Sequence, residues 1–455
     1  MYALNNRLRN TIFFISLFGL LAIWNIPNTI AARYVFEGLL LLSVMTASLP
    51  WGLFFKKSKL LLIFFAYVII QTAFLSTDLK EALLNFKSEW MHFILFSWIG
   101  AGAGLLIARQ GHKEILFYIG LAFSVPLLIH FVLFIIKAIE IGGIPQHYWG
   151  INKHHFELGF TALQASICLS VFLLFQTPTR LKKILASICL LLCITSPLLA
   201  MSRFGVAFVL LCLFFALALY FIFKRNGFRL KTKELILLLV AVLSVGALIK
   251  IGATIDPVRW SGLTSRALVG FYGDPQEVFC NGIEPLRDSL QSHGVAITPE
   301  IEKALDSVKD GDGARVMAAR SGLSLIFEYP FGINGSRQAY QRAIQAECGK
   351  APAIFISHTH NAWIDTSLAI GIPGAVLLLL VMLNYAYSGF HLRRFNQTIN
   401  PFAVALLITA CVWIVRGITD PTLRDQMLEM QAFMLAFLFA MALQTHSMNA
   451  ARNQA

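Results

Sequence analysis

Long runs of hydrophobic residues recur along the chain, and short polar segments separate them. A transmembrane α-helix needs about 20 predominantly apolar residues to cross the hydrocarbon core of a bilayer. Runs such as 235–248 are apolar almost throughout and lack the alternation of a membrane β-strand, so the pattern predicts helices. We expect about twelve transmembrane spans, near residues 11–31, 35–54, 60–76, 90–109, 115–137, 158–176, 184–201, 205–223, 235–252, 362–386, 401–417 and 426–444.

The composition favours the same class of protein. Hydrophobic residues make up 57% of the 455 positions, charged residues make up 13%, and the mean hydropathy is +0.69. Soluble domains usually contain about 25% charged residues, and a soluble core cannot bury this much apolar surface. We therefore expect an all-α polytopic membrane protein, with much of its surface in contact with lipid.

The positions of the basic residues predict the orientation of the spans. With a cytoplasmic N-terminus, every second loop is basic, as the positive-inside rule requires. The basic residues of these loops are Arg7, Arg9, Lys56, Lys57, Lys59, Arg109, Lys113, Arg180, Lys182, Lys183, Lys224, Arg225, Arg229, Lys231, Lys233, Arg393, Arg394 and Arg452. The alternation predicts that both termini are cytoplasmic. It also accounts for much of the net charge of +13, so we expect no nucleic-acid partner.

The first apolar run, 11–24, follows Arg7 and Arg9 as the core of a signal peptide would. No clear small-x-small cleavage site follows it, and many further apolar runs do. We interpret this run as the first transmembrane helix.

Three outer segments are longer than simple turns. Residues 77–89 begin with Asp78 and Glu81 in capping-box spacing among several leucines, which predicts a short interfacial helix. Residues 139–157 are rich in histidine and aromatic residues. The third segment, 253–361, is by far the longest.

This long segment divides the chain into three parts. Residues 1–252 would form the first nine spans, and residues 253–361 a helical periplasmic loop domain between the ninth and tenth spans. Residues 362–455 would form the last three spans and a cytoplasmic tail.

Two helices are expected within the loop. Thr298 and Pro299 are a typical N-cap and first helical residue, and a second helix is expected over about 314–328. Between the two helices, Asp310 and Asp312 alternate with glycines, which favours a turn. The same acid pair is also a candidate for metal binding, although no zinc spacing of Cys and His and no nucleotide-binding loop is present.

The cysteines fall into two groups. Five lie inside apolar runs, where cysteine behaves as a small hydrophobic residue. Cys280 and Cys348 are the two in the long outer loop, and a periplasmic loop would allow a disulfide between them. Two free thiols are the alternative.

Two arginines near the ends of apolar runs are candidates for function, because charged groups in membrane spans are costly. Arg203 lies between two spans with almost no loop, and Arg416 lies one turn before Asp420, its expected ion-pair partner. The alternative for Arg203 is a structural role, in which the side chain extends toward the lipid headgroups. For Arg416 a structural role is favoured over a functional one.

The outer segments contain further basic residues, against the positive-inside trend: Lys153, His154, His155, Arg259, Arg266, Arg287, Arg315, Arg320, Arg337 and Arg342. An arginine fork binds phosphate oxygens in a bidentate manner, so a diphosphate ligand at the outer leaflet would explain several of them. The alternative is a solvated loop surface with Glu277, Glu284, Asp288 and Glu302 as counter-ions.

His358, His360 and Asn361 form the sharpest polar cluster, directly before the span that begins near Ala362. A neutral imidazole at this position could take a proton from a hydroxyl group. Asn361 could bind a sugar or orient the ring, or it could simply cap the following helix.

Four short motifs together resemble the O-antigen ligase family. His360-Asn361, nine residues, and then Gly371-Ile372-Pro373-Gly374 is similar to that family's H-N-x9-G-x-x-G signature. Residues 314–335 resemble its Arg-led loop helix and the following turn with Pro330, Gly332 and Gly335, although Ala319 stands where a tryptophan is usual. Ser202-Arg203 and His154-His155-x3-Gly159-Phe160 resemble two further family motifs.

The resemblance implies a GT-C-like membrane glycosyltransferase without metal or cofactor. Its donor would be a glycan on undecaprenyl diphosphate, and its acceptor a sugar hydroxyl of lipid A-core, among membrane lipids at the periplasmic face of the bacterial inner membrane. His360 would be the general base, and Arg203 and Arg315 would stabilise the leaving diphosphate. Substrate contacts are expected from Asn361, His358, Arg266, Lys153, His154, His155, Arg337 and Arg416.

Related activities are the alternatives. An O-antigen polymerase would use the same donor, but polymerases often have two sizeable periplasmic loops, and here residues 139–157 form a short loop. A protein O-oligosaccharyltransferase belongs to the same superfamily. A lipid or solute transporter should place several charges within paired spans, and few are present.

Overall fold

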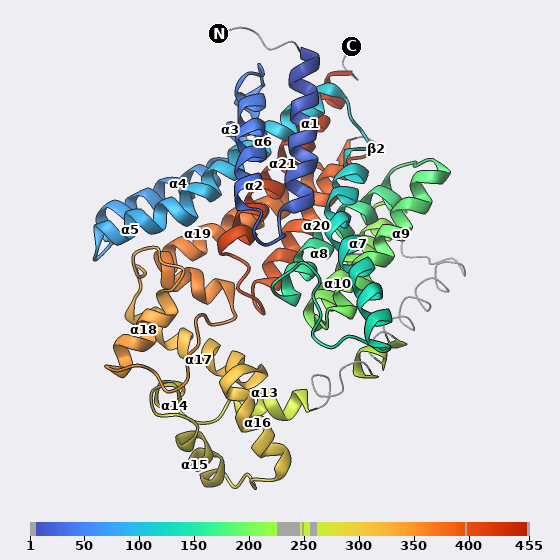
Figure 1. The fold of residues 1–455 in the computed structure, drawn as a ribbon. Helices are drawn as coiled ribbons and strands as arrows, with labels where there is room; N and C mark the ends of the chain where they lie inside the picture. Colours follow the sequence, from blue (N-terminus) through green and yellow to red (C-terminus); the bar gives the residue numbers. More distant parts are fainter. Residues whose placement is uncertain (1–5, 225–245, 248–249, 255–261, 396–397, 453–455) are drawn as a thin grey trace.

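The computed structural model describes residues 6–224, 246–247, 250–254, 262–395 and 398–452 (Figure 1). The N-terminal part contains α1 (Asn6–Ile23), α2 (Ile30–Met45), α3 (Trp51–Lys57), α4 (Lys59–Ile70), the π-helix η1 (Gln71–Leu75), α5 (Leu79–Asn85), the π-helix η2 (Phe86–Trp90), α6 (Met91–Gln110), α7 (Ile115–Ile141), α8 (His155–Phe175), α9 (Arg180–Leu199) and α10 (Arg203–Lys224).

A second group of shorter helices follows and packs as a separate unit, which we call the loop domain (residues 262–361). It contains α13 (Leu263–Val269), α14 (Pro275–Asn281), α15 (Glu284–Ser292), α16 (Pro299–Asp310), α17 (Asp312–Glu328) and α18 (Ala339–Cys348). The chain then returns to the bundle through α19 (Ala362–Leu392), the two-residue strands β1 (Arg394–Phe395) and β2 (Thr398–Ile399), α20 (Pro401–Arg416) and α21 (Asp425–Arg452). The start of α1 and the end of α21 both lie at the end of the molecule opposite to the loop domain (Figure 1).

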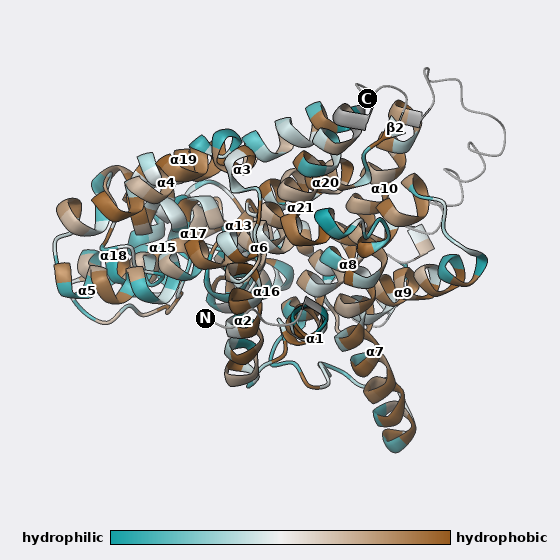
Figure 2. Cartoon of the chain, turned by 90° about the horizontal axis from the view of Figure 1, so that it is seen from above, coloured by the Kyte–Doolittle hydropathy of each residue, from teal (hydrophilic) through white to brown (hydrophobic). Residues whose placement is uncertain are grey.

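Hydrophobic residues cover the outer faces of the bundle helices as well as its core. Figure 2 shows this along α2 and α7, where Val35, Met45, Ile136 and Ile139 are all more than half exposed. In water such surfaces would be unfavourable, so these faces are the ones that contact lipid.

The centre of the bundle is the packing of α6 against α21. Gly100 and Gly104 lie one turn apart on α6, and a Cβ atom at either would lie within 2.5 Å of a backbone oxygen of α21, that of Phe433 or Phe437. Small residues at this spacing allow two membrane helices to approach closely. The glycine-rich stretch of α6 is therefore explained by helix packing.

Seven described helices are long and apolar enough to cross a membrane, and an eighth results if the bent pair of α3 with α4 and η1 counts as one span. The chain is thus a multi-pass helical membrane protein. α20 is apolar but shorter, and the expected span at 235–252 lies largely outside the described residues. The expected number of twelve stays a prediction.

Two expected span boundaries are wrong. The run 11–31 is one helix only as far as Ile23, because Pro27 and the left-handed residue Asn28 (φ +62°) form a turn before α2 begins. The run 35–54 is likewise broken, since α2 ends at Met45 and α3 begins directly after Pro50. Proline has no N–H to continue a helix. Each turn has only a few residues, so hydropathy averaged over about 20 residues does not separate the helices on its two sides.

The loop domain has its own hydrophobic core, which includes Val278, Leu286, Leu305 and Met317. The two helices expected there are confirmed. The Oγ1 atom of Thr298 accepts a hydrogen bond from the N–H of Ile301 at the start of α16, and α17 begins two residues earlier than expected. The cap of α5 is also present, since Asp78 accepts a hydrogen bond from the N–H of Glu81.

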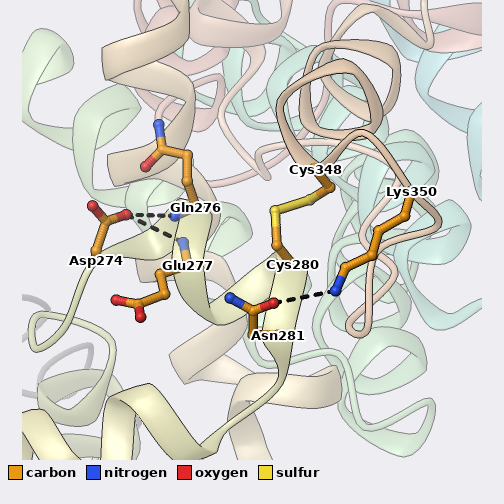
Figure 3. Close-up of a disulfide and its surroundings, with 7 residues drawn as sticks. All are labelled: Asp274, Gln276, Glu277, Cys280, Asn281, Cys348 and Lys350. Carbon is orange, nitrogen blue, oxygen red and sulfur yellow. Dashed lines mark hydrogen bonds between the residues drawn. A yellow bond between two sulfur atoms is a disulfide. The ribbon is translucent and has the colours of Figure 1, made fainter.

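A disulfide joins α14 to the end of α18 in this domain. Its partners are Cys280 and Cys348, 68 residues apart in sequence, so of the two alternatives that the sequence left open for them the disulfide is confirmed (Figure 3). Beside it, the side chain of Asp274 caps α14, and Lys350 donates a hydrogen bond to Asn281. The covalent link joins two short helices that both contribute to the hydrophobic core of this domain.

Candidate active site

A cavity of about 820 Å³ lies between the bundle and the loop domain. Its polar wall includes His155, Glu157, Arg203, Arg266, Lys309, Asp312, Arg315, His358, His360, Arg416, Asp420, Arg424 and Asp425. Its apolar wall includes Phe156 and Phe160 of α8, Phe204 of α10 and Met427 of α21. The cavity can therefore accept a ligand that is anionic at one part and apolar at another.

A tight turn directly before α19 presents the two histidines to this cavity. His360 has a left-handed backbone (φ +57°), and the rings of His358 and His360 lie 4.2 Å apart between their centroids. The buried Thr359 between them holds the turn, because its N–H and its hydroxyl both donate to Asp365 at 2.9 Å. The Oδ1 atom of Asn361 accepts from the N–H groups of Trp363 and Ile364, so this residue is the N-cap of α19.

Both histidines are held in the neutral form. Burial first, and then the guanidinium groups of Arg424 and Arg315, lower the pKa of His358 to about 4. The pKa of His360 is depressed even more, by burial first and then by His358, Arg315 and Arg424. A neutral imidazole can accept a proton, which is the state a general base needs.

Arg315 reaches the cavity from the first turn of α17. Its guanidinium carbon lies 5.5 Å from the centre of the Phe204 ring. Its Nη1 atom is buried and has no hydrogen-bond partner among the described residues. A buried donor without a partner is costly, so this atom is a candidate for contact with an anionic ligand.

Arg203 and Arg266 meet on one carboxylate. The Nη2 atom of Arg203 lies 2.9 and 3.2 Å from the two carboxylate oxygens of Asp312, and the Nε atom of Arg266 lies 3.2 Å from one of them. Asp312 is the first residue of α17, so it stands one turn before Arg315. Three guanidinium groups from three helices thus line the cavity around one acid.

Arg416 forms the floor of the cavity next to α8. It is fully buried, its Nε atom pairs with Asp420 at 3.3 Å, and its Nη1 atom donates to the carbonyl of Gly159. Its guanidinium carbon lies 4.1 Å from the centre of the Phe160 ring. The expected Arg416–Asp420 pair is confirmed, and it explains why Gly159 and Phe160 occur together.

The glycine signature of α19 marks a break in the helix. Gly371 has a φ of +82°. The N–H of Ile372 therefore donates to the carbonyl of Pro330 in the loop domain rather than to its own helix, and Pro373 has no N–H. The two carbonyls left over, those of Leu368 and Ala369, must find other donors.

The turn after α17 supplies those donors. The N–H of Ile333 donates to Leu368 at 2.7 Å, and that of Gly335 donates to Ala369 at 2.9 Å. Lipid offers no hydrogen-bond partner, so a break in a membrane helix must be satisfied by protein in this way. The two glycine motifs are thus one structural unit, which fixes the loop domain to α19.

Gly332 is the position where this unit has no room for a side chain. It has a φ of +83°, and a Cβ atom there would lie 2.4 Å from the carbonyl oxygen of Ala369. We expect Gly332→Ala to cost on the order of 2 kcal/mol or more and to lower the midpoint of thermal unfolding in detergent. Gly143→Ala is the control, since its surroundings are open, and equal midpoints for both variants would contradict this account.

Some residues expected at the site lie elsewhere. Lys153 and His154 do not line the cavity, and His154 stacks on Phe156 with ring centroids 5.0 Å apart. Arg337 pairs with Asp425 and Glu89 behind the cavity wall.

Other outer arginines have structural partners. Arg287 binds Glu302, Arg320 donates to the carbonyls of Gly270, Tyr272 and Gly273, and Arg342 pairs with Glu81. Arg259 lies outside the described residues. The structural alternative therefore holds for Arg287, Arg320 and Arg342. Among the described arginines of the predicted set, Arg266 and Arg315 line the cavity, together with Arg203.

Sequence reasoning missed Arg424 and the role of Asp312. Arg424 lines the cavity and pairs with Asp425 at 3.2 Å. It follows Pro421 in a segment that the predicted topology places outside, where basic residues are not expected. Asp312 was considered as a turn residue or metal ligand, and it binds two arginines instead. No group of three His, Cys, Asp or Glu side chains that could hold a metal ion occurs in the part of the chain that the structure describes.

Comparison with protein families gives an independent result. Residues 186–379 match the family model described as O-Antigen ligase. The matched region contains α10, the loop domain and most of α19, and with them Arg203, Arg315 and His360. No curated protein matches the chain. The match confirms the family resemblance of the three motifs that lie within it, at Ser202-Arg203, at residues 314–335 and at His360 to Gly374, and it supports an O-antigen ligase family assignment.

Proposed function

We propose that the protein transfers a glycan from undecaprenyl diphosphate to a sugar hydroxyl of lipid A-core at the periplasmic face of the inner membrane. One observation carries the proposal: His360, Arg315 and Arg203 line the same cavity although they belong to three distant segments. The apolar wall beside them suits the polyprenyl chain of a lipid donor. The loop domain and the bundle would enclose the diphosphate between them.

In this mechanism His360 is the general base. It takes the proton of the acceptor hydroxyl while that oxygen forms a bond to the anomeric carbon of the donor glycan. The bond between this carbon and the diphosphate oxygen breaks, and its electron pair stays on the diphosphate. Attack opposite the leaving group inverts the anomeric centre.

The guanidinium groups stabilise the departing diphosphate. Charge develops on the bridging oxygen as the bond breaks, and fixed cations close to it lower the barrier. Arg315 is the best placed, because its Nη1 atom has no hydrogen-bond partner within the described residues. We assign Asn361 to capping α19 and thereby to holding the turn that carries His360.

The pH dependence should report on His360. Because burial and neighbouring guanidiniums depress its pKa, the base stays neutral as the pH falls through 6.5. We expect kcat/KM for the donor, which reports the free enzyme, to be level between about pH 8 and pH 5. A bound diphosphate adds negative charge and raises this pKa, so the acid limb of kcat should lie at a higher pH than that of kcat/KM. An inflection of kcat/KM near pH 6.5 would contradict this.

Reconstitution with two acceptors tests the function. Purified protein in liposomes receives a lipid-linked glycan together with either lipid A-core or a second lipid-linked glycan. Transfer to lipid A-core supports the ligase. Elongation of the lipid-linked glycan alone would show an O-antigen polymerase, which the same cavity could serve.

A further inference from the structure

Asp312 binds two of the cavity's arginines. It engages Arg203 of α10 through both oxygens and Arg266 of α13 through one, at 2.9 to 3.2 Å. All three side chains are largely buried, with 14 to 21% of each exposed. The three groups come from different helices, so the ion pair also joins the bundle to the loop domain.

A carboxylate in this position presents the same chemistry as a phosphate. Arginine forks bind the paired oxygens of either group in the same geometry. Arg315 lies one turn further along the same helix, and its Nη1 atom has no hydrogen-bond partner in the described part of the chain. In the cavity, Arg315 therefore has a donor available for an anionic ligand, whereas Arg203 and Arg266 are bound to the carboxylate of Asp312.

The arginines of the cavity need a negative charge close to them when no anionic ligand is bound. Guanidinium groups that are partly removed from water and left without a counter-ion are unfavourable, and they repel one another. A carboxylate at the start of α17 lowers this cost, and the N-terminal end of a helix favours a negative charge. The same carboxylate competes with any anionic ligand for Arg203 and Arg266.

We propose that Asp312 is a positioning residue that serves as an internal counter-ion. Before the donor binds, its ion pairs hold Arg203 and Arg266 in place. When the donor diphosphate binds, it replaces Asp312 as the partner of both arginines. After transfer, Asp312 takes both arginines back and displaces the undecaprenyl diphosphate product. This inference rests on the proposed function, since it takes a diphosphate as the ligand.

The substitution Asp312→Asn separates this role from a scaffold role. Without the competing charge, inorganic pyrophosphate should bind at least fivefold more tightly, as measured by titration calorimetry on the full-length protein in nanodiscs. Glycan transfer should show a lower KM for the donor together with a lower kcat, because product leaves more slowly. A scaffold alone would predict weaker binding and a higher KM, and either result would overturn the inference.

Two further variants complete the experiment. Asp312→Glu keeps the charge and should bind pyrophosphate within about twofold of the wild type. Asp288→Asn removes the same charge from the exposed surface of α15 and should leave the affinity unchanged, so tighter binding there too would attribute the effect to net charge and overturn the inference. A wild-type protein that does not bind pyrophosphate would instead contradict the proposed function itself.

Discussion

Replacement of His360 by alanine is expected to lower the rate of glycan transfer by about 10²–10⁴-fold, the usual contribution of a general base. The acceptor hydroxyl would then have to lose its proton to water or to a less well placed group. The measurement is the rate of transfer to lipid A-core in liposomes, with the amount of protein in the membrane determined in parallel.

The control for this variant is His293→Ala. His293 lies on the exposed end of α15 and binds the carbonyl of Ser289, so its loss should leave transfer unchanged. His358→Ala tests the neighbouring ring, which is 4.2 Å from His360. If His358→Ala abolished transfer while His360→Ala retained it, the base would be His358, and near-normal transfer in both would remove the histidines from the mechanism.

The sequence predicted elements well where the physical signal is local. The N-caps at Asp78 and Thr298 and the helix α16 follow from side chains within three residues of one another. The predicted ends of α1 and α2 were wrong because the turns that follow these helices are much shorter than the window over which hydropathy is averaged. Hydropathy indicates whether a segment lies in lipid or in water, but it does not indicate where the backbone turns.

The candidate site divides in the same way. His360, Arg315 and Arg203 were recognised from short motifs, and the structure brings them to one cavity. Arg337 and Arg320 are arginines of the same loop, yet neither lines the cavity, because Arg337 pairs with Asp425 and Arg320 donates to backbone carbonyls. Sequence spacing cannot distinguish the two cases, because the partner of each arginine is decided by contacts between segments far apart in the chain.

The glycines of the family signature illustrate what a motif can hide. From the sequence, Gly371 and Gly374 appeared only as spacing after His360. The structure gives Gly371 a backbone role, since its left-handed conformation breaks α19 and allows the loop domain to bind there. The signature thus combines the proposed catalytic base, His360, with a break in α19 to which the loop domain is bound.

Arg315→Ala is expected to reduce transfer by about 10²–10³-fold, the range found when one stabilising donor of a developing anion is removed. Arg315→Lys should recover little of this loss. A lysine ammonium is a point charge on a flexible chain, so it cannot reproduce the planar fork or the contact with the Phe204 ring. Arg287→Lys is the matched control, because Arg287 binds Glu302 away from the cavity, and full rescue by lysine at position 315 would reduce the role of Arg315 to simple charge.

The residual activity of Arg315→Ala offers a second, independent measurement. The guanidinium of Arg315 helps to depress the pKa of His360, so its removal should raise that pKa and move the acid limb of kcat/KM to higher pH. Arg315→Lys keeps the positive charge and should leave the limb close to its wild-type position. A loss of activity with no such difference between the two variants would mean that Arg315 acts on the diphosphate alone, without electrostatic contact with the base.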